Sequence, residues 1–154
     1  MAMKPSILLF SIFITLTASA QMPPANADHM KKYITDSTAI AGVLTDIYFK
    51  GIYEGDVKLL ESAYYDGTLL FGDVKDQPYY KTLAQYLDGV KNRQSPKDSG
   101  KPFSGDIISI EIINSIAVAK VQVKMYDFNY HELLSFHRFG NKWLIVNKMI
   151  SDVQ

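Results

Sequence analysis

The chain contains no cysteine, no excess of either charge and none of the short motifs that mark common enzyme classes. Zero cysteines exclude a disulfide framework and a lipid attached through a thiol, so stability has to come from a packed core. Sixteen basic and sixteen acidic side chains cancel, which argues against general nucleic-acid binding. No nucleophile elbow, phosphate loop, dinucleotide fingerprint or zinc spacing occurs, and no cofactor is expected. The 154 residues, 47% of them hydrophobic, predict one globular domain.

The first twenty residues have the pattern of a secretory signal peptide. Lys4 precedes an apolar run at residues 7–16, and the small residues at 18–20 match a cleavage site before Gln21. A membrane anchor is the alternative. The apolar run is too short for that role, because a bilayer core is about 30 Å thick.

These signals divide the chain into three segments. Residues 1–20 are expected to be the signal peptide, and residues 21–34 a flexible leader that contains two prolines. Residues 35–154 then form a single domain. We expect a secreted or periplasmic protein with no membrane attachment after cleavage.

The first half of this domain predicts three helices. The N-cap residues at 35–37 precede apolar residues at helical spacing, and Gly55 can end this helix in a left-handed C-cap. Asp56 follows at once and can cap a short second helix. Pro78 suits the first turn of a third helix. The buried stripe of this third helix would consist of Leu83, Tyr86, Leu87 and Val90.

The second half predicts a short strand and then an antiparallel meander. Residues 68–72 form the short strand. Residues 107–113 are almost wholly apolar, which predicts a strand that is central or covered on both faces. Residues 117–126 alternate between apolar and mixed side chains, as in a strand with one buried face. The last turn closes at residues 140–143.

The whole pattern resembles the nuclear transport factor 2-like superfamily and, within it, the bacterial group labelled putative lumazine-binding. The segments that carry the resemblance are residues 53–56, 64–72 and 140–148, whose letters are YEGD, YYDGTLLFG and GNKWLIVNK. It extends over residues 35–149 as a distributed pattern. The resemblance implies an α+β fold shaped as a cone, with about three N-terminal helices packed in a bent, mostly antiparallel sheet around a cavity. Relatives of this fold include both enzymes and ligand-binding domains, so the fold alone does not select a function.

Glu132 is the candidate catalytic residue that the strand pattern favours. If Phe128 and Asn129 are the central residues of the turn before it, Met125 lies opposite Glu132 on the apolar face. A carboxylate there would lose hydration and could exchange protons with a bound ligand. The alternative is an ordinary solvated residue at a strand end. The resembling group usually has Asp at this position.

Asp66 is the second candidate, as a base at the mouth of the cavity, although a turn residue is the simpler interpretation. It lies near a His-Pro-Asp-Ala segment of the resembling group but lacks the His and the Pro. His131 and His137 lie six residues apart on one strand, too far to chelate together, so no metal site is expected. The residues predicted to line a ligand cavity are Tyr48, Tyr64, Phe71, Tyr86, Met125 and Phe136.

Three functions stay open at this point. The first is an exported domain that binds a small apolar or aromatic ligand. The second is a cofactor-independent isomerase, dehydratase or cyclase that uses a carboxylate in the cavity. The third is an interaction domain with a closed core. An open pocket with a buried carboxylate would favour the enzyme.

We also expect a homodimer through the mixed sheet face that bears Val118, Leu133 and Phe139.

Overall fold

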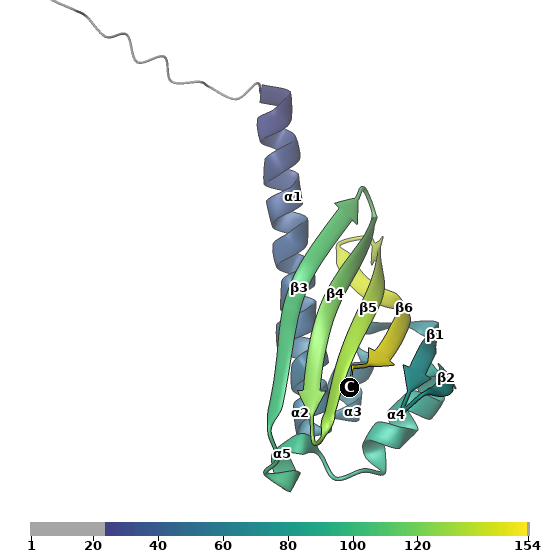
Figure 1. Cartoon of the computed structure of the whole chain (residues 1–154). Coiled ribbons are helices and arrows are strands. Elements are labelled where there is room, and N and C mark those ends of the chain that lie inside the picture. The colour runs from purple at the N-terminus through teal and green to yellow at the C-terminus, as the bar shows by residue number, and fades with distance from the viewer. Residues whose placement is uncertain (1–23, 154) are drawn as a thin grey trace, which may run out of the picture.

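The computed structural model describes residues 24–153, which form a layer of helices on one face of a curved six-stranded sheet (Figure 1). The helical elements are α1 Pro24–Gly42, the π-helix η1 Val43–Phe49, α2 Lys50–Glu54, α3 Val57–Glu61, α4 Leu83–Lys91 and α5 Pro96–Ser99. The strands are β1 Tyr64–Val74, β2 Gln77–Thr82, β3 Phe103–Ile113, β4 Ile116–Met125, β5 Phe128–Phe139 and β6 Lys142–Asp152. The predicted signal peptide lies outside the described residues.

The sheet is mixed and open. Its strand order is β2-β1-β6-β5-β4-β3, in which β1 pairs with β6 in parallel and all the other neighbours are antiparallel. The inner face packs against the helices and contains the hydrophobic core, whereas no helix covers the outer face in Figure 1. The predicted α+β class with a bent, mostly antiparallel sheet is confirmed.

The first helix begins earlier than the sequence pattern suggested. It starts at Pro24, inside the predicted leader, where proline suits the first helical position. Its first turns project beyond the sheet and bury no apolar stripe, so hydrophobic spacing could not reveal them (Figure 1). Polar contacts stabilise this part instead. Within the helix, Lys32 Nζ lies 2.6 Å from a carboxylate oxygen of Asp36, and the Tyr33 hydroxyl donates to the Ile110 carbonyl of β3 at 2.9 Å.

The boundary between the first two predicted helices is confirmed. Gly55 ends α2 in a left-handed conformation with φ 69°, which glycine adopts at little cost. Asp56 caps α3 by accepting a hydrogen bond from the Leu59 amide at 3.0 Å. Asp56 therefore has a structural role.

The third helix starts later in the chain than the sequence analysis predicted. Pro78 lies in β2, which is an edge strand of the sheet and can accommodate a residue without an N–H group. Helix α4 starts at Leu83, where Thr82 and Gln85 form a reciprocal capping box. The predicted buried stripe of this helix is correct: Leu83, Tyr86, Leu87 and Val90 are all buried.

The turn between β4 and β5 was predicted two residues too late, so the predicted register of the two strands was wrong by four residues. The central residues of the turn are Tyr126 and Asp127, so Met125 pairs with Phe128 and Val121 pairs with Glu132. Tyr126 adopts φ 54°, a conformation that sequence preference assigns to Gly or Asn, and its hydroxyl donates to the Gln94 carbonyl. Because the error is an even number of residues, the predicted inward direction of Glu132 remains correct.

The apolar strand β3 was predicted to be central or covered on both faces, and it is neither. It forms one edge of the sheet, and Ile108 and Ile113 are exposed. An irregularity between Ile107 and Ser109 places an extra residue, Ile108, in the strand. The apolar composition therefore reflects an uncovered outer face as well as the core.

None of the helices between residues 24 and 153 combines the length and the apolar character that crossing a bilayer requires.

Candidate functional site

Three polar side chains form a closed cluster under the inner face of the sheet. Glu132 comes from β5, Lys148 from β6 and Tyr48 from η1. Lys148 Nζ lies 2.7 Å from Glu132 Oε1, and the Tyr48 hydroxyl donates to Glu132 Oε2 at 2.6 Å. Lys148 Nζ also donates to the Tyr48 hydroxyl oxygen at 2.6 Å. Tyr48 is fully buried, and the side chains of Glu132 and Lys148 are 2% exposed.

The two charged residues reach the inner face by different routes. Glu132 follows the ordinary alternation of β5, on the same side as Tyr130 and Leu134. In β6, Ser135 pairs with Asn147 but the next residue, Phe136, pairs with Ile145. Val146 is therefore an extra residue in the strand, a β-bulge. The bulge reverses the alternation, so that Lys148 points inward.

The neighbouring Glu132 keeps the Lys148 ammonium charged in spite of its burial. Burial alone would lower the pKa of the Lys148 ammonium, but the neighbouring Glu132 carboxylate outweighs this effect, and the pKa lies above its usual value. Burial and the Glu132 charge raise the pKa of the Tyr48 hydroxyl well above its usual value, so Tyr48 stays protonated. The Lys148 ammonium also lies 5.3 Å from the Tyr48 ring centroid and 5.0 Å from that of Tyr86.

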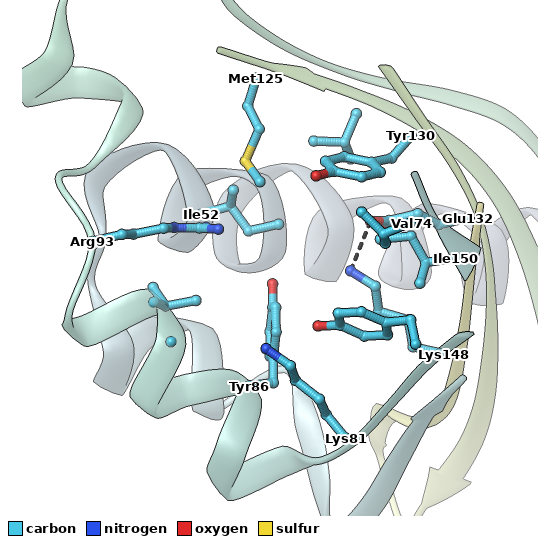
Figure 2. A pocket seen from close by; sticks show the side chains of 14 residues that line it. Ile52, Val74, Lys81, Tyr86, Arg93, Met125, Tyr130, Glu132, Lys148 and Ile150 are labelled. Carbon is cyan, nitrogen blue, oxygen red and sulfur yellow. Dashed lines mark ion pairs between the residues drawn. The ribbon is translucent and has the colours of Figure 1, made fainter. Parts of the chain in front are cut away.

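A pocket of about 170 Å³ lies beside the cluster, between α2, α4 and the inner face of the sheet (Figure 2). Glu132 and Lys148 form part of its wall. Its apolar wall comprises Ile52, Val74, Val90, Val123, Met125 and Ile150, and its aromatic wall Tyr79, Tyr86 and Tyr130. An apolar cavity of about 150 Å³ in another protein binds benzene. The pocket is therefore large enough for one aromatic ring.

Two further cations line this pocket. Arg93 follows α4, and Lys81 comes from β2. Figure 2 shows Arg93 and Lys148 extending into the pocket from opposite sides. The Lys81 ammonium lies 5.1 Å from the Tyr79 ring centroid. With Glu132 as the one acidic residue in the wall, three cations face one carboxylate.

The structure brings only some of the predicted site residues together. Glu132, Tyr86 and Met125 line the pocket, and Tyr48 lies behind it in contact with Glu132. Tyr64 packs on the Tyr48 ring with the centroids 6.1 Å apart. The remaining predictions lie elsewhere: Asp66 is exposed on β1, Phe71 is exposed and lines a hollow on the outer face, and Phe136 is buried outside the pocket.

Sequence reasoning missed the cations of the pocket. Strict alternation from Trp143 and Ile145 would turn Lys148 outward. The bulge at Val146 reverses this direction, and no feature of the sequence indicates the bulge. Arg93 lies in a connection between two helices, where basic residues are normally solvated. The one sequence signal for a buried cation was Lys148 itself, a basic residue between the apolar Ile145 and Ile150.

Within residues 24–153, no three His, Asp or Glu side chains are arranged to hold a metal ion. His131 and His137 lie on the outer face of β5, where His131 lines a hollow beside Lys120 and the His137 ring contacts Phe139 with centroids 4.6 Å apart. We assign no cofactor to the pocket.

The fold and family of the chain are established by comparison with known proteins. Residues 35–151 match a family model described as "Putative lumazine-binding". A nuclear transport factor 2-like protein of unknown function from Shewanella baltica is 21% identical with a TM-score of 0.70, over 79% of this chain and 97% of its own. One from Methylobacillus flagellatus is 22% identical with a TM-score of 0.70, over 79% and 94%.

A third structure, a protein of the same fold and unknown function from Silicibacter pomeroyi, is 15% identical with a TM-score of 0.68, over 80% of this chain and 98% of its own. No match is found among the curated proteins. At these identities the solved structures establish the fold alone, and the family model covers most of the chain. The chain therefore belongs to the putative lumazine-binding family and has the nuclear transport factor 2-like fold.

Proposed function

We propose that this protein is a small-molecule-binding domain whose ligand occupies the pocket beside Glu132 and Lys148. The proposal rests on the composition of the pocket wall. Aromatic rings and aliphatic side chains surround space for one ring, with a few fixed polar groups at defined positions. The family description points to the same chemistry, because lumazine is a planar heteroaromatic compound. A two-ring ligand would place one ring inside and the second in the open mouth.

The experiment is native mass spectrometry of protein purified from its own source. A ligand retained by the pocket would add a fixed mass that is lost on unfolding. Gly89 lies at the wall on α4, and the nearest atom to an added Cβ would be Lys81 Nζ at 3.9 Å. Gly89→Leu should therefore fill the mouth without disturbing the core and abolish retention.

Ala84→Leu is the matched control, because Ala84 is exposed on the same helix and does not line the pocket. It should retain the ligand like the wild type. Equal retention by Gly89→Leu and the wild type would remove this pocket as the binding site.

A second candidate function is a cofactor-independent isomerase, dehydratase or cyclase. Its supporting observation is that the pocket wall contains a buried carboxylate, the combination that the sequence analysis set for an enzyme. Both oxygens of Glu132 are already engaged, one by Lys148 and the other by Tyr48, which leaves Glu132 poorly suited to accept a proton. We therefore place binding first. Incubation of the retained ligand with the protein in D2O separates the two, because only an enzyme would incorporate deuterium at carbon.

Export and self-association complete the proposal. Export is supported by Lys4, the apolar run and the small residues before Gln21, and N-terminal sequencing of the mature protein should start at Gln21. Recovery of intact Met1 in a membrane fraction would contradict it. Homodimer formation is supported by exposed apolar side chains on the outer face of the sheet: Ile113, Ile116, Val118, Leu133, Phe139 and Met149.

A further inference from the structure

The guanidinium group of Arg93 has an unused edge. Its Nε and Nη2 atoms are both buried, and neither has a hydrogen-bond partner within the part of the chain that the structure describes. These two nitrogens lie on the same side of the planar group and carry the parallel N–H bonds that bind carboxylate or phosphate oxygens in pairs. Buried cationic N–H groups without partners are costly, so this edge is suited to an acceptor that arrives with the ligand.

The excess of positive charge in the pocket wall also favours an anionic ligand. The Lys148 ammonium is matched by Glu132 at 2.7 Å. Arg93 and Lys81 are not matched in this way, because neither takes part in an ion pair between residues 24 and 153. The wall of the pocket therefore presents two positive charges in excess.

Resting on the proposed function, we propose that the ligand bears an oxyanion, either a carboxylate or a phosphate ester, on the aromatic ring that the pocket encloses, and that this oxyanion pairs with the Nε–Nη2 edge of Arg93. The pocket volume of about 170 Å³ limits the enclosed part to one ring. The ring lies among Tyr86, Tyr130 and Met125, and the oxyanion lies at Arg93 (Figure 2). Lys81 adds long-range attraction.

The test compares three probes that share one ring: benzoate, phenyl phosphate and the neutral benzamide. Titrations of wild-type protein at low salt should give at least one anion a Kd ten-fold or more below that of benzamide. The tighter of the two anions identifies the oxyanion. Equal affinity for all three probes would overturn the inference but leave the proposed function intact, whereas no binding of any probe overturns both.

Variants then assign the effect to Arg93. Arg93→Gln should raise the Kd of the preferred anion ten-fold or more and change that of benzamide less than two-fold. Arg93→Lys keeps the charge but not the paired N–H bonds, so its Kd should be intermediate. Lys91→Gln removes a charge from exposed Lys91 on α4, which does not line the pocket, and should change neither Kd.

A loss of affinity in Arg93→Gln should not result from unfolding of the variant. Because the Nε–Nη2 edge of Arg93 has no protein partner, Arg93→Gln should leave the Tm unchanged or raise it. A variant that keeps its Tm and still binds the anion like the wild type would disprove the role of Arg93.

Discussion

The ammonium group of Lys148 lies 2.7 Å from the carboxylate of Glu132, and both side chains are 2% exposed. The pair joins neighbouring strands β5 and β6, and the Tyr48 hydroxyl links it to the helical layer. The cluster therefore connects the two layers of the fold at the wall of the pocket. Removing either charge leaves the other buried without a counter-ion, which is the costly state for such a pair.

We expect Glu132→Gln or Lys148→Met alone to lower the free energy of unfolding by about 3–5 kcal/mol. The double variant removes both charges together and should be more stable than the sum of the single effects predicts, by about 2 kcal/mol or more. Urea unfolding of the four proteins measures this coupling.

The matched control is an exposed ion pair. Lys97 Nζ lies 3.2 Å from Glu54 Oε1, but these side chains are 54% and 30% exposed. Glu54→Gln should therefore change the free energy of unfolding by less than about 1 kcal/mol. If Glu132→Gln proved equally mild, the buried pair would contribute no more than a surface contact.

Local signals in the sequence predicted the fold and part of the site. Gly55 and Asp56 mark a helix end and a helix start with their own backbone chemistry, and both were predicted correctly. Glu132 could be placed on the inner face because β5 alternates without interruption. These features depend on neighbours within a few residues.

The rest depends on contacts between distant segments. The bulge at Val146, which turns Lys148 inward, exists only in the pairing of β6 with β5. The turn at Tyr126 takes a conformation that its sequence disfavours, and a bond to Gln94 holds it there. Arg93 continues the spacing of Tyr86 and Val90 from α4, but the residues opposite it in the wall come from distant strands, so the sequence does not show that it faces a pocket.

Alkaline pH should destabilise the fold between about pH 10 and pH 12. Burial raises the pKa of Tyr130 from 10.0 to about 12, and burial with the Glu132 charge raises that of Tyr48. In each case the folded state keeps a proton that the unfolded state releases, so the stabilising effect is fully present below pH 10.0 and is lost as the pH rises through the folded pKa. Lys148, whose pKa is also raised, acts in the same direction above 10.5.

Urea unfolding at a series of pH values measures this effect. Each such tyrosine contributes at most about 1.4 kcal/mol per pH unit to the slope. Tyr130→Phe removes one titrating group, so its stability should fall less steeply than that of the wild type in this range. Identical slopes for the two proteins would show that Tyr130 titrates alike in the folded and unfolded chains.

Gly72 is required where β1 approaches β6. It has φ 145°, and an added Cβ would lie 1.7 Å from the Ile150 carbonyl oxygen, so a side chain would push the two strands apart. Gly72→Ala should lower the free energy of unfolding by about 2–5 kcal/mol, since strain from overpacking adds to that of the backbone. Gly67 also has a positive φ, 83°, but nothing lies within 4 Å of its added Cβ. Gly67→Ala should cost only about 1–2 kcal/mol, and chemical denaturation of both variants tests whether the difference exists.

The outer face of the sheet provides the last prediction. Val118 and Leu133 lie on β4 and β5 and are 43% and 38% exposed, which favours a second copy of the chain as their cover. Light scattering should report a dimer at micromolar concentration. Leu133→Lys would place a charge on this apolar face and should raise the dimer Kd at least about 30-fold, the effect of losing one strong contact residue. Met30→Lys introduces the same charge at an exposed residue of α1, outside the sheet face, and should leave the dimer intact. A monomeric wild type would disprove the dimer and leave the pocket proposal unaffected, because all the residues that line the pocket belong to one chain.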